Sequence, residues 1–315
     1  EAPLIPGVAQ CGAAKRAEDQ LLLQTRSAVV AAEGRGNLSA EDAGLIHYPG
    51  TDRLRARGEW CEVQEPPAQW ALRTCPWAGW RPNLRVKVLT YNLYWWNLFD
   101  RKGGAGRSAG KLIARTAGSH GYDLMAFQEC DDRWRVLADA RAEGLSGDYD
   151  AVDGGKALAI LYRRSRWRLL SAGRMDVGED GPAQYYGRRS VHWVRLQNYA
   201  TGKTVFFMNH HGPLPINQAG SCTGSAAALN IMKAIANNAH GHDAIFLVGD
   251  FNAQRRSSRI QELSRRLRRS YTGRSMGGVD HIFKNCRWIS WGRNLGKGYG
   301  WAGSDHDALS SNFLI

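Results

Sequence analysis

Side chains that suit a hard metal ion or a phosphate group follow several apolar stretches of this 315-residue chain. They comprise Asn92, Glu129, the run Asn209 to His211, the pair Asp250 and Asn252, and the run Asp305 to Asp307. Carboxylate and amide oxygens are the ligands that Mg²⁺ prefers, and an imidazole of near-neutral pKa can take a proton from water. This set of residue types predicts metal-assisted attack of water on a phosphorus centre.

Each of these residues also has an ordinary structural interpretation. Asn92 and Asn252 suit turns, Asp250 suits a helix cap, and His210 suits a hydrogen-bonded surface position. Taken singly, these interpretations are the more common ones. The occurrence of all the residues in one chain, each where an apolar stretch stops, favours a common site.

The elements that must position these residues alternate along the chain. Apolar and β-branched runs predict strands over residues 86–93, 124–128, 157–162, 191–196, 204–209, 244–248, 279–283 and 287–291. Helical periodicity predicts helices over residues 111–119, 132–143, 225–239 and 257–269. This alternation is typical of an α/β protein whose sheets are covered by helices.

Six segments resemble, in order, the motifs of the endonuclease/exonuclease/phosphatase superfamily. They are LTYNLYW (90–96), MAFQEC (125–130), FMNHHGP (207–213), VGDFNA (248–253), GVDHIF (278–283) and GSDHDAL (303–309). The superfamily includes deoxyribonuclease I, abasic-site endonucleases, cytolethal distending toxins, neutral sphingomyelinases and inositol-polyphosphate 5-phosphatases. The resemblance covers residues 85–315, and it implies a four-layer α/β sandwich of two mixed β-sheets flanked by helices, with the active site at one edge.

The resemblance also implies a role for each motif residue. Asn92, Glu129 and Asp305 correspond to the metal site, with Glu129 as the principal ligand, and Mg²⁺ is the expected ion, with Mn²⁺ or Ca²⁺ as alternatives. His306 corresponds to the base that activates water, and Asp280 to the carboxylate that orients its ring.

The remaining motif residues correspond to phosphate contacts. Asp250 and Asn252 are expected to contact the scissile phosphate and the water or metal. His211 is expected to stabilise or protonate the leaving side, with His210 as the weaker candidate. Arg189 falls where relatives place a phosphate-binding arginine, and Arg188 is the alternative.

One position departs from the deoxyribonuclease I pattern. That enzyme and its close relatives place a glutamate, the partner of the leaving-side histidine, just before the strand that corresponds to residues 158–162. This chain has Gly154, Gly155 and Lys156 there. His211 is therefore expected to lack that carboxylate partner.

The charge of the chain bears on its substrate. The 42 Lys and Arg exceed the 29 Asp and Glu, and the whole excess lies in residues 84–315, with 33 basic and 19 acidic residues against 9 and 10 in residues 1–83. Such a surplus favours a polyanionic partner, although a bias toward arginine codons is an alternative explanation. Two tracts concentrate the charge: residues 163–174 have five Arg and no acid, and residues 255–269 have seven Arg and one Glu. The second tract also suits the solvated face of an amphipathic helix with Ile260, Leu263 and Leu267 buried.

Composition limits the class of protein. With 43% hydrophobic residues, the chain is neither a disordered tail nor a collagen, and no apolar run reaches the length of about 18 residues that a membrane-spanning helix needs. Six cysteines match no zinc pattern; Cys11, Cys61 and Cys75 favour an oxidising compartment, whereas Cys130 suits a buried thiol. A sequon at Asn37 and the start of the chain at Glu1 agree with a secreted, mature form.

Residues 1–83 resemble no family that we can name, and form a predicted extension to a catalytic domain over residues 84–315. A helix is expected over residues 13–33. The tryptophans of the extension, Trp60, Trp70, Trp77 and Trp80, are expected to pack against the catalytic domain, with an aromatic binding platform as the alternative.

These observations predict a secreted, monomeric, metal-dependent nuclease that acts on DNA with little sequence preference. The alternative is a sphingomyelinase-type lipid phosphodiesterase, because the segment with Tyr94, Trp95, Trp96, Leu98 and Phe99 suits a membrane interface. A third interpretation is a non-catalytic nucleic-acid-binding module, which intact motifs disfavour.

Overall fold

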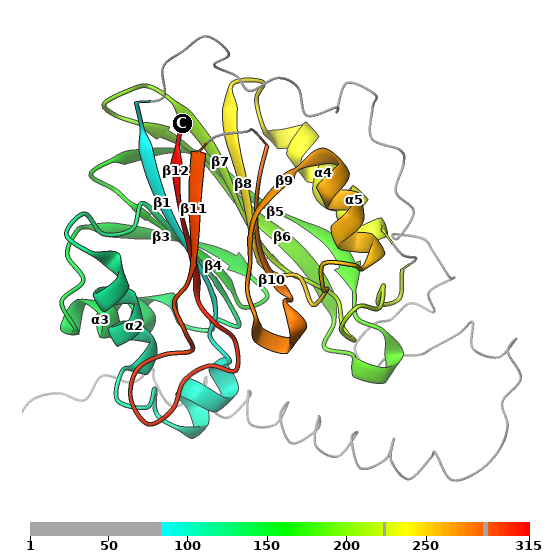
Figure 1. The fold of residues 1–315 in the computed structure, drawn as a ribbon, viewed down its shortest axis with the longest axis horizontal. Helices are drawn as coiled ribbons and strands as arrows, with labels where there is room; N and C mark the ends of the chain where they lie inside the picture. Colours follow the sequence, from blue (N-terminus) through cyan, green and yellow to red (C-terminus); the bar gives the residue numbers. More distant parts are fainter. Residues whose placement is uncertain (1–82, 223–224, 286–288) are drawn as a thin grey trace, which may run out of the picture. The chain divides into compact units, whose positions relative to one another are not determined.

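The structure, a computed structural model, describes residues 83–222, 225–285 and 289–315 (Figure 1). All of them belong to the larger of the two units of the chain, Gly58–Ile315. The predictions for the helix at 13–33, the sequon at Asn37, the four tryptophans of the extension, and Cys11, Cys61, Cys75 and Cys286 lie outside the described residues. The division into an extension over 1–83 and a catalytic domain over 84–315 therefore stays a prediction.

Two six-stranded mixed sheets form the centre of the described part. Sheet A has the order β11 (Ile289–Asn294), β12 (Leu309–Leu314), β1 (Arg85–Asn92), β2 (Leu124–Gln128), β4 (Leu158–Arg163) and β3 (Tyr149–Gly155). Sheet B has the order β5 (Trp167–Glu179), β6 (Arg188–Asn198), β7 (Thr204–His211), β8 (Asp243–Asp250), β10 (Asp280–Lys284) and β9 (Arg268–Thr272). One neighbouring pair in each sheet is parallel, β1 with β2 and β7 with β8, and all other pairs are antiparallel.

Four α-helices cover the sheets: α2 (Ser108–Ala117), α3 (Arg133–Ala142), α4 (Ala226–Asn238) and α5 (Ser258–Arg266). Side chains at two N-caps accept hydrogen bonds from the first turn, Asp132 at α3 and Ser257 at α5, as caps of this type do. A π-helical turn, η3 (Trp96–Arg101), and two 3₁₀ turns, η4 (Pro182–Gln184) and η5 (Ser275–Gly277), complete the helical elements of the described residues.

The layers follow from the two-residue period of the strands. In β7, Val205 and Phe207 face the layer between the sheets, while Phe206 and Met208 face α4 and α5. The outer face of sheet A packs in the same way against α2 and α3. Three apolar layers therefore hold four layers of backbone together, in the order helices, sheet A, sheet B, helices, as Figure 1 shows. This confirms the predicted sandwich.

The sequence pattern missed β3, β5, β9 and β12. β5 pairs only with β6, lies at the edge of sheet B, and exposes much of its length between Trp167 and Val177. β3 is an edge strand of sheet A and ends in two glycines. β12 lies inside sheet A, but buried serines interrupt its apolar run. The predicted helix over 257–269 was wrong at its end: α5 stops at Arg266, and the chain continues from Arg268 as β9.

The topology brings one end of each central strand to the same edge. β1 and β2 are parallel and end at Asn92 and Gln128, and β7 and β8 are parallel and end at His211 and Asp250. β10 begins at Asp280 opposite Asp250. These five positions therefore lie at the same edge of the sandwich, at the ends of the strands, where ligands commonly bind in α/β proteins.

Candidate active site

Asp250 lies at the centre of the residues gathered at this edge. Its Oδ2 lies 3.1 Å from Asn92 Nδ2, 3.5 Å from His211 Nε2 and 3.5 Å from His306 Nε2. The side chain is almost fully buried. Three strand ends and the loop before β12 therefore converge on a single carboxylate oxygen.

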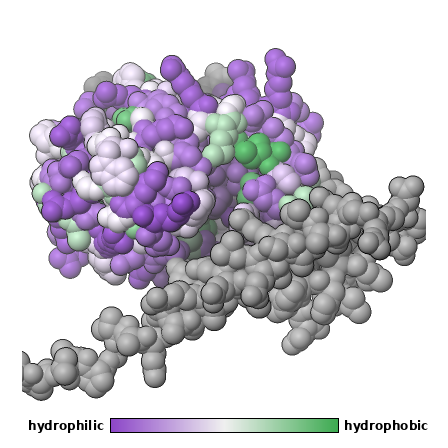
Figure 2. Space-filling model, turned by 90° about the horizontal axis from the view of Figure 1, so that it is seen from below, coloured by the Kyte–Doolittle hydropathy of each residue, from purple (hydrophilic) through white to green (hydrophobic). Residues whose placement is uncertain are grey.

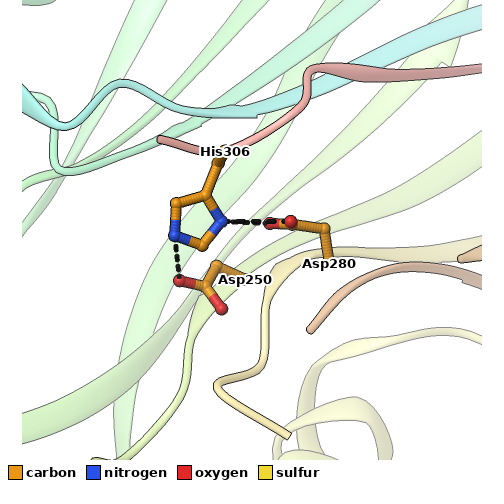
Figure 3. Close-up of side chains that lie close together, drawn as sticks. All are labelled: Asp250, Asp280 and His306. Atoms are coloured by element: carbon orange, nitrogen blue, oxygen red, sulfur yellow. Dashed lines mark hydrogen bonds and ion pairs between the residues drawn. The ribbon is translucent and has the colours of Figure 1, made fainter. Parts of the chain in front are cut away.

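His306 lies between two aspartates (Figure 3). Its Nδ1 is 3.0 Å and 3.1 Å from the two oxygens of Asp280, while its Nε2 faces Asp250. Because a carboxylate accepts hydrogen bonds, Nδ1 carries a proton and Nε2 is the nitrogen that can take one. Ser304 holds the loop, since its hydroxyl donates to Asn92 O and accepts from the amide of His306.

The electrostatics of this pair favour a charged imidazole in the metal-free protein. Burial lowers the pKa of His306, but the negative charge of Asp250 and the hydrogen bond with Asp280 outweigh burial and raise the pKa above its usual range. A base that acts on water needs a pKa near the working pH. The charges of Asp250 and Asp305 must therefore be offset, as a bound divalent cation would do, before Nε2 of His306 can take a proton from water.

Glu129 and Asp305 line the outer part of the site. Their side chains are 29% and 35% exposed, against 1% for Asp250. Asn92 donates from Nδ2 to Glu129 as well as to Asp250, at 3.0 Å and 3.1 Å. The pKa values of Glu129 and Asp305 are raised, first by burial and then by the charge of Asp250.

This carboxylate cluster fits a divalent cation. In the part of the chain that the structure describes, no Lys or Arg forms an ion pair with Glu129, Asp250 or Asp305, and the charge of Asp250 raises the pKa values of Glu129 and Asp305. These three side chains offer oxygen atoms, the ligands that Mg²⁺, Mn²⁺ and Ca²⁺ prefer. Asp250, Asp280 and His306 also present ligand atoms within 4.8 Å of one another, but the hydrogen bond between Asp280 and His306 suits proton transfer better than coordination.

The backbone at the site is strained at three non-glycine residues. Tyr94, Glu129 and Asn252 have φ values of 51°, 49° and 46°. Each follows the end of a strand by one or two residues, so a left-handed turn begins where the chain leaves β1, β2 and β8. Strain of this kind costs of order 1 kcal/mol or more, and persists where the surroundings require it.

His211 is held by an arginine. Its Nδ1 lies 3.2 Å from Arg189 Nη1, and Arg189 in turn donates to both oxygens of Asp180, at 2.7 Å and 2.8 Å. Because arginine has no acceptor, Nδ1 of His211 accepts and Nε2 carries the proton. Burial and the charge of Arg189 lower the pKa of His211 well below its usual range, so the ring is neutral.

This arrangement changes the expected roles of two residues. Arg189 bonds Asp180 and His211, and its side chain is only 13% exposed, so it holds His211 in place instead of facing the substrate. His211 presents an N–H to the site and is a hydrogen-bond donor instead of a source of protons. Arg188, the alternative, lies 3.6 Å from Asp176 and is 45% exposed.

The glycines at 154 and 155 explain the departure from the deoxyribonuclease I pattern. A Cβ at Gly154 would lie 2.5 Å from the ring of His192, and one at Gly155 would lie 2.1 Å from Arg174. No side chain fits there without displacing these neighbours. On the Nδ1 side of His211, Arg189 takes the place of the glutamate that deoxyribonuclease I has there. Arg189 is in turn held by Asp180.

Two other strand-end residues do not line the site. His210 is fully buried beside Phe251, donates from Nδ1 to Ser190 O, and has its pKa lowered to about 3 by burial. Asn209 bonds Phe127 O and Ala159 O of sheet A and accepts from Gln128. The pair Gln128 and Asn209 therefore ties the two sheets together one residue before Glu129 and two before His211.

Asn252 lies within the loop that follows Asp250. Its amide nitrogen donates to Asp250 Oδ1, and its Nδ2 donates to Gly212 O at 3.0 Å. These bonds fix the loop beside His211. Sequence reasoning assigned no role to Asp180, Ser304 or Gln128, which position other residues; Gln128 and Ser304 lie within quoted motifs, whereas Asp180 lies outside them.

The aromatic segment after β1 is mostly internal. Trp95, Leu98 and Phe99 belong to the core beneath sheet A, and Trp95 stacks on Phe99 at 4.1 Å between ring centroids. Only Trp96, 50% exposed, presents a large surface to solvent. The face at the end of the sandwich opposite the C-terminus is largely hydrophilic where it is visible in Figure 2. The membrane-interface interpretation of this segment loses its support.

The basic tracts lie at different ends of the sandwich. Arg163 and Arg166 are near Asp123, before β2, and therefore at the edge opposite the site. Arg255 and Arg256 follow Asn252 closely, on the side of the site. Arg259 is buried and donates to carbonyl oxygens of Pro213, Phe251 and Gln218, so its role is structural.

Comparison with known proteins places the fold and the motifs in one family. The sequence model of the Endonuclease/Exonuclease/phosphatase family matches residues 89–308. No curated protein is significantly similar to the sequence. A family protein from Bacteroides thetaiotaomicron of known structure is 21% identical, with a TM-score of 0.54, over 73% of this chain and 95% of that one.

Two further structures show how varied the similar proteins are. A mannosyl-6-phosphatase from Bacteroides thetaiotaomicron is 21% identical, with a TM-score of 0.54, over 73% of this chain and 100% of its own. TDP2 of D. rerio, solved with a single-strand DNA product, is 15% identical, with a TM-score of 0.51, over 74% of this chain and 100% of its own. At these identities the structures share the fold, whereas the family match covers most of the chain. This protein therefore belongs to the endonuclease/exonuclease/phosphatase family, whose members are hydrolases of phosphoester bonds.

Proposed function

We propose that this protein is a secreted, metal-dependent nuclease that hydrolyses phosphodiester bonds of DNA with little sequence preference. The observation that carries the proposal is the buried pair of Asp280 and His306, in which Nε2 of His306 faces a cluster of carboxylates. This arrangement suits the activation of a water molecule beside a metal-bound phosphate.

The attacking water is activated by His306. Its Nε2 takes the proton, and Asp280 holds the ring and stabilises the imidazolium that forms, a type of assistance that contributes about 10² to 10⁴ in rate. Asp250, 3.5 Å from Nε2, lies where it accepts a hydrogen bond from the same water. No Ser or Cys nucleophile is required.

Glu129 and Asp305 would hold the divalent cation, which neutralises negative charge on the phosphate when bound. Asn92, proposed as a third ligand, turns its Nδ2 to Glu129 and Asp250 and its Oδ1 to Tyr94 N, so it would have to rotate its amide group to offer an oxygen to the ion. His211 donates from Nε2 toward the same space and stabilises charge on the phosphate oxygens. Asn252 positions the loop between these groups through its bond to Gly212 O. Each group stabilises a charge that grows as the pentacovalent oxygens form.

The charge of the catalytic region supports nucleic acid as the substrate. Residues 84–315 carry 33 basic and 19 acidic residues, and three of the acids are committed to the metal cluster. Phosphate contacts bind a backbone without reading its sequence, which supports low sequence preference. TDP2, of the same fold, has been solved with a single-strand DNA product.

Location outside the cell is supported by the cysteines. Cys222 takes part in a disulfide, whereas Cys130 is a free and buried thiol. Disulfides persist in oxidising compartments. None of the helices in the described residues combines the length and apolar character that crossing a bilayer requires.

A panel of substrates tests the proposal. Purified protein is incubated with supercoiled plasmid, RNA, sphingomyelin vesicles or mannose 6-phosphate, each with Mg²⁺ and with EDTA. We expect nicking of the plasmid at many sites with Mg²⁺ and none with EDTA. Release of phosphocholine without cleavage of DNA or RNA would establish a lipid phosphodiesterase. Binding of DNA without turnover in Mg²⁺, Mn²⁺ and Ca²⁺ would establish a binding module.

A further inference from the structure

A second group of arginines forms a pocket outside the catalytic cluster. The pocket has a volume of about 380 Å³ and is lined by Arg255, Arg256, Gln261, Ser264, Arg265 and Arg269. These residues come from three elements: the loop after β8, helix α5 and strand β9. Every lining side chain offers a hydrogen-bond donor, and none is a carboxylate.

The arginines of this pocket lack acidic partners. Arg265 pairs with Glu262 at 3.1 Å, but Arg255, Arg256 and Arg269 form no ion pair with a carboxylate among the described residues. Burial and the neighbouring charge of Arg255 lower the pKa of Arg269. Guanidinium groups that repel each other are thus held together where an anion would relieve the repulsion.

A merely solvated helix face does not account for this convergence. Arg266 lies on α5, is exposed, and does not line the pocket, as expected of a solvated position. Arg269 instead comes from β9, the strand that replaces the predicted end of the helix, and approaches Arg255 from a different element. The turn from α5 into β9 is what brings Arg269 to the pocket.

The pocket adjoins the active site along the chain. Arg255 is three residues after Asn252, and three residues span at most about 10 Å. Phosphates of a nucleic-acid strand follow one another at about 3.4 Å of rise in a duplex, so this separation corresponds to a few nucleotides. Arginine forks match the two oxygens of a phosphate group.

We infer that the pocket between α5 and β9 binds a backbone phosphate of the same nucleic-acid strand that is cleaved, a few nucleotides from the scissile bond. The inference rests on the proposed nuclease function and adds a distal phosphate subsite to it. The subsite makes the enzyme favour strands several nucleotides long over dinucleotides. It contributes to binding and takes no part in bond cleavage.

The test compares three variants made in a protein that His306→Ala has rendered catalytically inactive, here called the silenced protein. Arg255→Gln and Arg269→Gln remove charges of the pocket, and Arg266→Gln removes a neighbouring charge outside it. We measure the affinity for a 12-nucleotide single-stranded DNA at several salt concentrations. We expect each pocket variant to bind roughly three- to tenfold more weakly and to lower the slope of log affinity against log salt by about 0.7, the change for one phosphate on a single strand. Arg266→Gln should leave the slope unchanged.

A second measurement separates the subsite from the catalytic centre. In the active protein, Arg255→Gln and Arg269→Gln should hydrolyse bis(p-nitrophenyl) phosphate at the wild-type rate, but should show a raised KM for the 12-nucleotide DNA. Equal salt slopes for Arg269→Gln and Arg266→Gln would overturn the inference while leaving nuclease activity intact. Failure of the wild type to cleave DNA would instead overturn the proposed function, and absence of DNA binding by the silenced protein would overturn the subsite as well.

Discussion

At the scale of single residues, the site depends on which nitrogen of each histidine carries the proton. Asp280 fixes the proton of His306 on Nδ1, and Arg189 fixes that of His211 on Nε2. Towards the site, His306 therefore presents a hydrogen-bond acceptor and His211 presents a hydrogen-bond donor. Asp250, between them, contacts both.

The role of Arg189 gives a prediction. We expect Arg189→Met to lower kcat roughly 10- to 100-fold with a smaller change in KM, because the loss of the donor frees His211 to take the wrong tautomer. Steady-state kinetics on a defined oligonucleotide measure both constants. Asp180→Asn should show the same pattern more weakly, since Arg189 keeps one of its two bonds. A rise in KM with unchanged kcat would instead indicate that Arg189 binds substrate phosphate directly.

Much of the site was predictable from residue types. Glu129, Asp250, Asp280 and His306 occur in motifs, and the structure brings them together at one edge. The residues that sequence reasoning missed, such as Asp180, act on other side chains across turns. Asp180 meets Arg189 only because β5 and β6 pair next to each other, and no pattern in the sequence encodes that contact.

At the scale of elements, the parallel pair of β7 and β8 positions His211 and Asp250. The strands approach so closely at their ends that a Cβ on Gly249, where φ is 143°, would lie 2.0 Å from His210 O. Only glycine combines this backbone angle with this contact. The exact placement of Asp250 therefore depends on the residue before it.

Replacement of Gly249 tests this dependence. We expect Gly249→Ala to lower the free energy of unfolding by more than about 2 kcal/mol, through strain and separation of the strand ends. Urea denaturation monitored by circular dichroism measures the change. Gly241→Ala is the matched control: a Cβ there meets nothing within 4 Å, so its effect should be neutral or slightly stabilising. Similar stabilities for the two variants would contradict this account of the strand ends.

Strands that are continuous buried apolar runs were predictable, and the exposed edge strand β11 was predicted as well, whereas β3, β5, β9 and β12 were not. β2 and β8 are buried along their whole length and read as apolar runs. β5 is largely exposed, and β9 follows α5 within a single arginine-rich stretch that suits a helix equally well. In both places pairing with a neighbouring strand overrides the local preference, and pairing is a property of the tertiary fold.

At the scale of the whole molecule, buried neutral histidines make the fold sensitive to acid. Burial lowers the pKa of His192 to about 4, that of His281 to about 4 and that of His210 to about 3. The unfolded chain takes up these protons near pH 6.5, before the native state does. Their contribution to stability is therefore complete above pH 6.5 and is lost as the pH falls toward 4.

The effect of protonating a single histidine can be measured at His192. This residue lies away from the catalytic cluster, and both of its ring nitrogens lack a hydrogen-bond partner among the described residues. We expect His192→Leu to reduce the dependence of the unfolding free energy on pH by about 1.4 kcal/mol per pH unit between pH 6 and 5. Denaturation curves at several pH values give this slope, which is independent of any packing cost of the substitution. Parallel slopes for the variant and the wild type would show that His192 is charged in the native state.

The molecule as a whole combines a carboxylate cluster at one edge with an excess of basic residues elsewhere. Carboxylates gather at one edge of the sandwich, while residues 84–315 carry a large excess of arginine. The sequence showed the excess of arginine and the motifs, but not where the charges lie. A single arginine tract contains a buried arginine that supports the fold, arginines on a solvated helix face and arginines that line a pocket.

The central claim is that His306, held by Asp280, activates water for phosphodiester hydrolysis. The most direct measurement is the initial rate of plasmid nicking in Mg²⁺ for the wild type and for His306→Ala, with circular dichroism to confirm that both are folded. The proposed mechanism predicts a rate at least about 10²-fold lower for His306→Ala, and a large loss for Asp280→Asn as well. A folded His306→Ala protein that nicks DNA within about threefold of the wild-type rate would contradict it.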